Sequence, residues 1–126
     1  MDLRLSERHK ALQSEVRAFA ERERALSPKV GGGRKRPDSK MLDWQALLLE
    51  RGYFGRTIPQ EYGGFGAEPD VMEAAIIADE FSRGGLSPGI MNQGISMLVP
   101  TLLEVGREDQ KRAWIETTIR GETIWC

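Results

Sequence analysis

Residues Thr57–Gly66 form the stretch TIPQEYGGFG, which lies between two segments with helical periodicity. Glycine-rich loops often bind phosphate, but a dinucleotide loop needs G-x-G-x-x-G directly after a strand, and a P-loop needs a Lys after its glycines. Here the glycines fall as G-G-F-G, no Lys follows, and no apolar strand comes before. We therefore expect a structural surface connection in which Gly63, Gly64 and Gly66 supply turns with positive φ.

Apolar residues at helical spacing on both sides of this connection predict an all-α fold. We expect an antiparallel bundle of about five helices, over residues 6–26, 41–52, 69–84, 93–105 and 107–120. The helix over 93–105 contains a single charge, Glu104, and should be the most buried, with Pro100 kinking it or separating its first turn. The final ETIWC indicates the start of a β-strand, and a strand without a partner suggests the opening piece of something longer.

Two other segments give specific expectations. The helix over 69–84 has an apolar face of Val71, Ala74, Ala75, Ala78 and Phe81, widened by neighbouring apolar residues, so we expect it to be buried on more than one side. Gly31–Gly33 stand beside three basic residues and predict a mobile, solvated loop.

Few residues could support chemistry by themselves. The single histidine, His9, and the single cysteine, Cys126, provide neither a metal-ligand set nor a nucleophile–base pair. Asp79 and Glu80 are adjacent on a helix, so their side chains point about 100° apart and do not converge. We therefore assign no catalytic and no metal-binding residue, and we expect His9 to be a surface or partly buried histidine.

Charge and hydropathy restrict the partners and the location. Residues 1–40 hold 11 Lys/Arg against six Asp/Glu, without the aromatic interleaving that nucleic-acid binders use. No apolar run approaches the length of a membrane span, which is about 18 residues, and the N-terminus lacks a signal-peptide pattern. These features predict a cytoplasmic protein with no nucleic-acid partner and no membrane insertion.

Three sequence blocks resemble the N-terminal helical domain of the flavin-dependent acyl-CoA dehydrogenase family. They are RGYFGRTIPQEYGGFG (Arg51–Gly66), VGREDQKRAW (Val105–Trp114) and the final RGETIWC, and DWQALLLERG (Asp43–Gly52) is typical of bacterial members. The blocks occur in the family's order and cover about residues 40 to 120. The resemblance implies a helical domain over 1–121 and the first residues of a truncated β-domain over 122–126. It also implies that Tyr62 is buried with its hydroxyl satisfied and that Glu61 tethers the turn.

The family's reaction removes an α-proton and transfers a β-hydride to FAD, which gives a 2-enoyl-CoA. The resemblance therefore implies an acyl-CoA substrate and, in a longer enzyme, FAD, further domains and a homo-oligomer (dimer or tetramer). The acyl pocket would have one wall built from Asn92, Gly94, Ile95 and Leu98, although these residues equally fit a plain helix core. Only Cys126 would lie on the flavin side, so the 126-residue chain alone should bind no flavin.

An alternative function is a non-catalytic helical subunit or interaction module that completes a partner's pocket. The enzyme-fragment reading expects exposed apolar surface around Ile124 and Trp125 in the isolated chain, whereas a stand-alone protein would have no reason to end in an exposed apolar strand.

Overall fold

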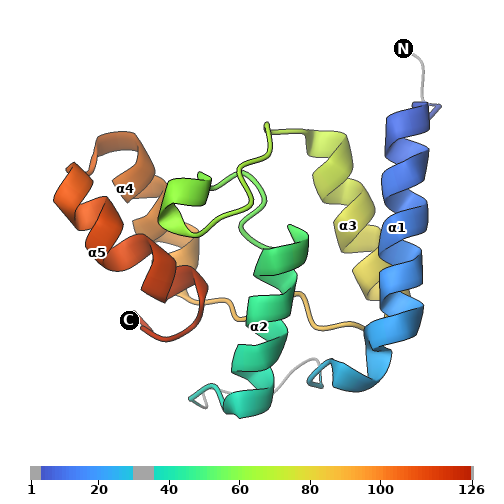
Figure 1. Cartoon of the computed structure of the whole chain (residues 1–126), viewed down its shortest axis with the longest axis horizontal. Coiled ribbons are helices and arrows are strands. Elements are labelled where there is room, and N and C mark those ends of the chain that lie inside the picture. Colours follow the sequence, from blue (N-terminus) through green and yellow to red (C-terminus); the bar gives the residue numbers. More distant parts are fainter. Residues whose placement is uncertain (1–3, 30–35, 126) are drawn as a thin grey trace. The chain divides into compact units, whose positions relative to one another are not determined.

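The computed structural model describes residues 4–29 and 36–125. Within these residues the chain forms helices and connections but no strand, which confirms the all-α class (Figure 1). The chain divides into two compact units. Unit 1 comprises residues 1–34 and 69–88, and unit 2 comprises residues 35–68 and 89–126. The loop predicted at Gly31–Gly33 lies outside the described residues.

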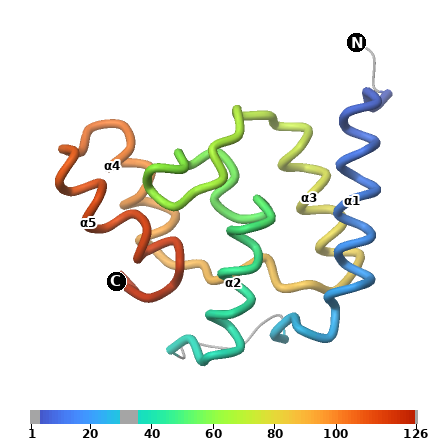
Figure 2. Tube along the Cα trace, in the orientation of Figure 1, coloured from blue at the N-terminus to red at the C-terminus, as the bar shows by residue number. Residues whose placement is uncertain are grey.

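Unit 1 is a pair of helices, α1 (Glu7–Glu23) and α3 (Val71–Gly84), which lie side by side (Figure 2). Both begin at a capping side chain. Ser6 Oγ accepts the N–H of His9, and Asp70 Oδ1 accepts the N–H groups of Met72 and Glu73. These bonds satisfy donors that the first turn of a helix otherwise leaves unpaired.

The two helices of unit 1 run in the same direction, so the prediction of an antiparallel bundle is wrong for this pair. Arg8, at the start of α1, bonds to Glu73 at the start of α3, and Arg17 further along bonds to Glu80. Short loops force helices to be antiparallel. Here α2 (Ser39–Arg51) and long connections separate α1 from α3 along the chain, and this length permits a parallel pair.

The widened apolar arc predicted for α3 is buried only in part: Ile76, Ile77 and Phe81 are buried, whereas its other residues are exposed. Val71 is 88% exposed, and Ala74, Ala75 and Ala78 are also exposed. The buried residues are Glu73, Ile76, Ile77, Glu80 and Phe81, and the Phe81 ring stacks on Phe19 of α1 at 6.1 Å between centroids. The prediction of a centrally buried α3 is therefore wrong in this chain. Apolar periodicity included the three apolar residues that are buried but missed Glu73 and Glu80, because charged residues are ordinarily placed on the solvent side of a helix.

Unit 2 contains α2, α4 (Val99–Val105) and α5 (Glu108–Ile119) around an apolar core. The buried core residues are Leu49, Tyr62, Val99, Leu102, Ile115 and Ile119. The side-chain amide of Gln45 is fully buried and links two backbone segments of unit 2. Its Nε2 donates to the carbonyl of Ile119 at 2.6 Å, and its Oε1 accepts the N–H of Ile90 at 2.8 Å.

The predicted helix over 93–105 is two elements, a π-helix (Gly94–Leu98) followed by α4. The prediction that Pro100 separates the first turn is confirmed. Proline has no N–H for an α-helical bond, and the chain instead makes the wider bond from Val99 N–H to Gly94 O. The prediction that this segment is the most buried is wrong, because Met97 is 64% and Val105 75% exposed and α4 buries only Val99 and Leu102.

The Thr57–Gly66 connection contains a short 3-10 helix (Gln60–Tyr62), and the positive φ predicted for its glycines is found at two of the three. Gly63 and Gly66 have φ of 91° and 78°, whereas Gly64 does not have a positive φ. Gly64 is needed for space instead, since a Cβ there would collide with the carbonyl of Ile58. Tyr62 is buried with its hydroxyl bonded to Glu108, which confirms the expectation for this residue. Glu61 contacts Arg112 of α5 at 3.4 Å, but both side chains are more than half exposed, so this pair holds the turn only weakly.

The strand predicted in ETIWC does not form within the described chain, where residues 122–125 follow α5 as a turn and an irregular segment. A strand needs a neighbour with which to exchange hydrogen bonds, and none is present here. Cys126 lies outside the described residues.

Candidate substrate-binding site

The predicted site residues lie on one short segment of unit 2, which begins with Asn92. Asn92 Oδ1 accepts the N–H of Gly94 at 2.8 Å. The Asn92 carbonyl accepts the N–H groups of Ile95 and Ser96, each at 3.1 Å, and the Ser96 hydroxyl at 3.2 Å. Asn92 therefore caps the π-helix with both its side chain and its backbone, and this arrangement fixes the orientation of its amide.

Gly94 is where another part of unit 2 approaches this segment. It is buried, and a Cβ at this position would collide with the indole of Trp125 and lie 2.9 Å from Asn92 Oδ1. The indole is held in turn by Thr118, which accepts its Nε1–H at 2.8 Å, and by an edge-to-face contact with Trp114. The absence of a side chain at residue 94 thus allows an aromatic ring to contact the π-helix backbone.

The other two predicted residues have different surroundings. Leu98 packs against the buried core of unit 2, which favours the alternative that it is a core residue. Ile95 is partly buried. Met91 and Met97 flank the site and are 61% and 64% exposed. The segment therefore has an inner side that belongs to the core and an outer side that presents flexible apolar side chains.

One polar atom of the site has no hydrogen-bond partner in the part of the chain that the structure describes. Asn92 Nδ2 is buried, and no acceptor contacts it. Buried donors are nearly always paired, so this atom requires a specific explanation. No Lys or Arg occurs between Gly84 and Gly106, and the only charge in this interval is Glu104.

A second polar group of unit 2 lies at Tyr62. Its hydroxyl contacts both carboxylate oxygens of Glu108, at 2.7 and 2.9 Å, and the Lys111 and Arg112 cations lie within 6 Å of its ring centroid, at 5.9 and 5.8 Å. The hydrogen bond to Glu108, followed by burial, raises the pKa of Tyr62 to about 12. A tyrosine held protonated in this way is a structural donor.

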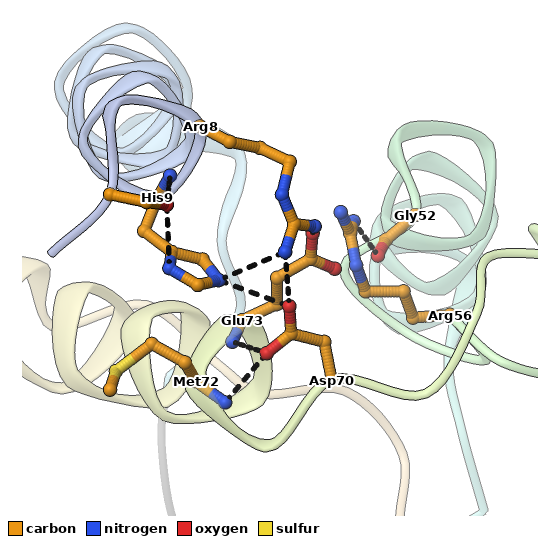
Figure 3. A network of polar contacts seen from close by, with 8 residues as sticks. Arg8, His9, Gly52, Arg56, Asp70, Met72 and Glu73 are labelled. Carbon is orange, nitrogen blue, oxygen red and sulfur yellow. Dashed lines mark hydrogen bonds and ion pairs between the residues drawn. The ribbon is translucent and has the colours of Figure 1, made fainter. Parts of the chain in front are cut away.

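Unit 1 holds the densest polar cluster, at the start of its two helices (Figure 3). Asp70 Oδ2 contacts Arg8 Nη2 at 2.8 Å and His9 Nε2 at 3.0 Å, and Arg8 Nη1 donates to Glu73 at 2.7 Å. The bond with His9, and next the N–H of Glu73, hold the pKa of the Asp70 carboxyl well below its usual range. His9 is partly buried, as expected. Each carboxylate here has a cationic partner, which favours a structural role over a catalytic one.

The rest of the described chain contains an open cavity but no metal-ligand cluster. An open cavity of about 570 Å³ in unit 2 is lined by Ala46, Leu49, Glu50, Gln60, Gly63, Gly64, Phe65 and Arg120, and none of the predicted site residues is among them. Residues 4–29 and 36–125 contain no group of three or more side chains that could hold a metal ion. Over the same residues, no helix is both long and apolar enough to cross a membrane.

Sequence reasoning missed Trp125, Thr118 and Gln45 as parts of this region. Gly94 was the available signal for Trp125, because a glycine inside an apolar helical pattern often marks a close approach. Gln45 and Thr118 gave none, since polar residues on an amphipathic helix are ordinarily placed on its solvent side.

Comparison with known proteins agrees with this fold. The family model "Acyl-CoA dehydrogenase, N-terminal domain" matches residues 6–122. Human short-chain specific acyl-CoA dehydrogenase, mitochondrial, is 33% identical over 126 residues, which are 97% of this chain and 29% of that protein. The (2S)-methylsuccinyl-CoA dehydrogenase of Cereibacter sphaeroides is 29% identical over 120 residues, which are 95% of this chain and 21% of that protein.

A solved structure named "Tcur3481-Tcur3483 steroid ACAD" is similar with a TM-score of 0.65 at 28% identity, over 98% of this chain and 32% of that one. The chain therefore spans between 21% and 32% of the length of these relatives. The family match covers nearly all of the described residues, including the Thr57–Gly66 turn and the π-helix segment. The chain belongs to the acyl-CoA dehydrogenase N-terminal domain family.

Proposed function

We propose that this chain is the N-terminal helical domain of a flavin-dependent acyl-CoA dehydrogenase, and that it contributes one wall of the acyl pocket. Residues 1–121 would be the helical domain, and residues 122–126 would begin a β-domain. The proposed reaction is α,β-dehydrogenation of an acyl-CoA thioester to a 2-enoyl-CoA. Names of relatives support an acyl thioester as the substrate class, since two of them are called short-chain specific acyl-CoA and (2S)-methylsuccinyl-CoA dehydrogenases.

The observation that carries the pocket assignment is the π-helix at Gly94–Leu98 with its cap at Asn92. π-Helical turns are rare and occur frequently at functional sites. Here the turn places partly buried Ile95 between the exposed Met91 and Met97. An apolar, adaptable surface of this kind suits an acyl chain. Leu98 would support this wall from the core side.

We propose that this chain makes little contact with flavin. Cys126, the one residue on the proposed flavin side, lies outside the described residues, and the Nε1–H of its neighbour Trp125 already donates to Thr118. FAD, when bound, would accept the hydride, and we propose that other domains of the complete enzyme hold it and supply the catalytic base. A homo-oligomer and a cytoplasmic location belong to the same proposal.

The test uses the complete gene product that contains residues 1–126. We expect it to carry flavin and to reduce an electron-accepting dye when given an acyl-CoA. Ile95→Trp narrows the proposed wall, so it should raise KM for the preferred thioester by about tenfold or shift the preference to shorter acyl chains. Glu104→Gln, at an exposed residue of α4, serves as the control and should leave kinetics unchanged.

Two results would count against this function. A complete gene product that binds no flavin and oxidises no acyl-CoA would favour the alternative of a non-catalytic helical subunit. An Ile95→Trp variant that behaves like Glu104→Gln would remove the π-helix segment from the pocket.

A further inference from the structure

The side-chain amide of Asn92 has a hydrogen bond at its oxygen but none at its nitrogen. Its Oδ1 accepts the Gly94 N–H at 2.8 Å, so the amide cannot be rotated by half a turn without pointing its NH2 at another donor. Nδ2 is therefore the atom of the amide that this bond does not use. It is buried, and no acceptor among the described residues contacts it.

Capping does not explain this arrangement. Ser, Thr or Asp would cap the π-helix equally well through one oxygen, and none of them would bury an unpaired NH2. Leaving a buried donor unpaired destabilises the fold, and such groups commonly have a functional role. The free donor is thus the feature of Asn92 that the fold itself does not require.

The surroundings define what this donor could bind. The segment from Gly84 to Gly106 contains no Lys or Arg, so it offers a carboxylate no cation of its own. A neutral amide in an apolar setting pairs best with a neutral oxygen, because an anion that lost its water there would lack a counter-charge.

We propose that Asn92 is a specificity-determining residue that donates a hydrogen bond to a neutral oxygen, a ketone or a hydroxyl, on the acyl group of the substrate. This inference rests on the proposed function and names its substrate class. An acyl chain that carries such an oxygen would pair Nδ2, whereas a plain hydrocarbon chain would leave it unpaired.

The oxygen would reach Asn92 over Gly94. The Trp125 indole and the Asn92 amide both border the space where Gly94 lacks a side chain. Trp125 is held there by one hydrogen bond, to Thr118, and by the edge of Trp114. A shift of this ring would open the approach to Nδ2 while the cap remained in place.

The experiment compares matched thioesters in the complete gene product. The probes are 4-oxopentanoyl-, 5-oxohexanoyl- and 7-oxooctanoyl-CoA, each paired with the analogue in which a methyl group replaces the oxygen. Affinity is measured by calorimetry, and kcat/KM is measured in parallel. In the parent protein we expect at least one oxo compound to bind about tenfold tighter than its methyl partner.

The decisive variant is Asn92→Asp, which keeps an oxygen for the Gly94 N–H but removes the NH2. It should abolish the oxo preference, measured as the affinity ratio between each oxo compound and its methyl partner, even where the new carboxylate weakens the binding of both. Asn92→Leu removes cap and donor together and should lose the same preference. Gln93→Leu replaces the adjacent exposed amide and should retain it.

The outcomes separate this inference from the proposed function. An oxo preference in affinity that depends on Asn92 supports the inference even if no thioester is dehydrogenated, a result that would count against the reaction alone. Dehydrogenation without any oxo preference in the parent protein, or with a preference that survives Asn92→Asp, overturns the inference.

Discussion

Unit 1 joins α1 and α3 through buried apolar side chains flanked by charged pairs, whereas unit 2 is closed around an apolar core that also holds neutral polar groups. In unit 1 the buried carboxylates of Glu73 and Glu80 each accept a hydrogen bond from an arginine of α1. In unit 2 the interior polar groups are an amide, Gln45, and a hydroxyl, Thr118, both bonded to backbone carbonyls. Charged pairs specify which helix positions meet and therefore the parallel direction, while neutral groups tie segments of backbone together without a charge in the core.

The two units can be observed separately. All three tryptophans, Trp44, Trp114 and Trp125, belong to unit 2, and so do both tyrosines. Tryptophan fluorescence therefore follows unit 2 alone, and hydrogen exchange in α1 and α3 follows unit 1.

The largest effect should come from Gln45→Leu in unit 2. This change leaves the Ile119 carbonyl and the Ile90 N–H buried without their partner. Each unpaired group costs about 1–3 kcal/mol, so we expect the free energy of unfolding of unit 2 to fall by about 2–4 kcal/mol. Urea denaturation followed by tryptophan fluorescence measures it.

The matched control for this prediction is Gln93→Leu, which removes an exposed amide and should change stability by less than about 0.5 kcal/mol. If Gln45→Leu were as stable as Gln93→Leu, neutral buried polar groups would not be what ties unit 2 together.

The next largest effect should come from Arg17→Met in unit 1. The Glu80 side chain is 4% exposed, and this change removes the guanidinium that bonds both of its oxygens. We expect exchange in α1 and α3 to accelerate by about tenfold, and Arg17→Met combined with Glu80→Met to restore most of the protection, since no buried charge is then left unpaired.

Lys10→Met is the control for the charged pairs, because Lys10 and Glu7 are both exposed and their contact at 3.4 Å should contribute little. Equal exchange in Arg17→Met and Lys10→Met would mean that apolar packing alone joins α1 to α3.

This contrast also explains what sequence reasoning could and could not provide. Helix positions followed from apolar spacing and from caps such as Ser6 and Gly52, because these signals are local. The buried face of α3 and its parallel direction could not be predicted in this way. They depend on Glu73 and Glu80, which contact arginines 65 and 63 residues away in the chain. In the candidate site, the segment could be predicted, but the π-helix, the Trp125 contact and the free Asn92 donor are tertiary properties.

A smaller effect in unit 1 should appear in acid. The pKa of Asp70 is held below its usual range by His9 and by the N–H of Glu73. A lowered pKa in the folded state stabilises unit 1 above about pH 4, the unfolded value, and this stabilisation is lost as the pH falls further. Protection of the α1 and α3 amides, taken relative to their intrinsic exchange rate at each pH, should therefore fall below about pH 4, and Asp70→Asn should remove this dependence while weakening the pair at neutral pH.

Asp43→Asn, an exposed position on α2, should leave the acid dependence of α1 and α3 as it is in the parent chain. An acid response that persists in Asp70→Asn would assign it to other carboxylates of unit 1.

The smallest effect concerns Tyr62 in unit 2 and is confined to alkaline pH. The bond to Glu108, and then burial, raise its pKa to about 12, so the folded state holds this proton more tightly than the unfolded chain, whose tyrosine titrates near 10. A raised pKa stabilises unit 2 fully below about pH 10, and the stabilisation is lost as the pH rises toward 12.

The ultraviolet absorbance of tyrosinate should thus show one of the two tyrosines ionising late. That late step should be absent in Tyr62→Phe and shifted to lower pH in Glu108→Gln, where the acceptor keeps its oxygen but loses its charge. A late step that survives in Tyr62→Phe would belong to Tyr53, and the hydrogen bond between the Thr57–Gly66 turn and α5 would then not account for the late ionisation.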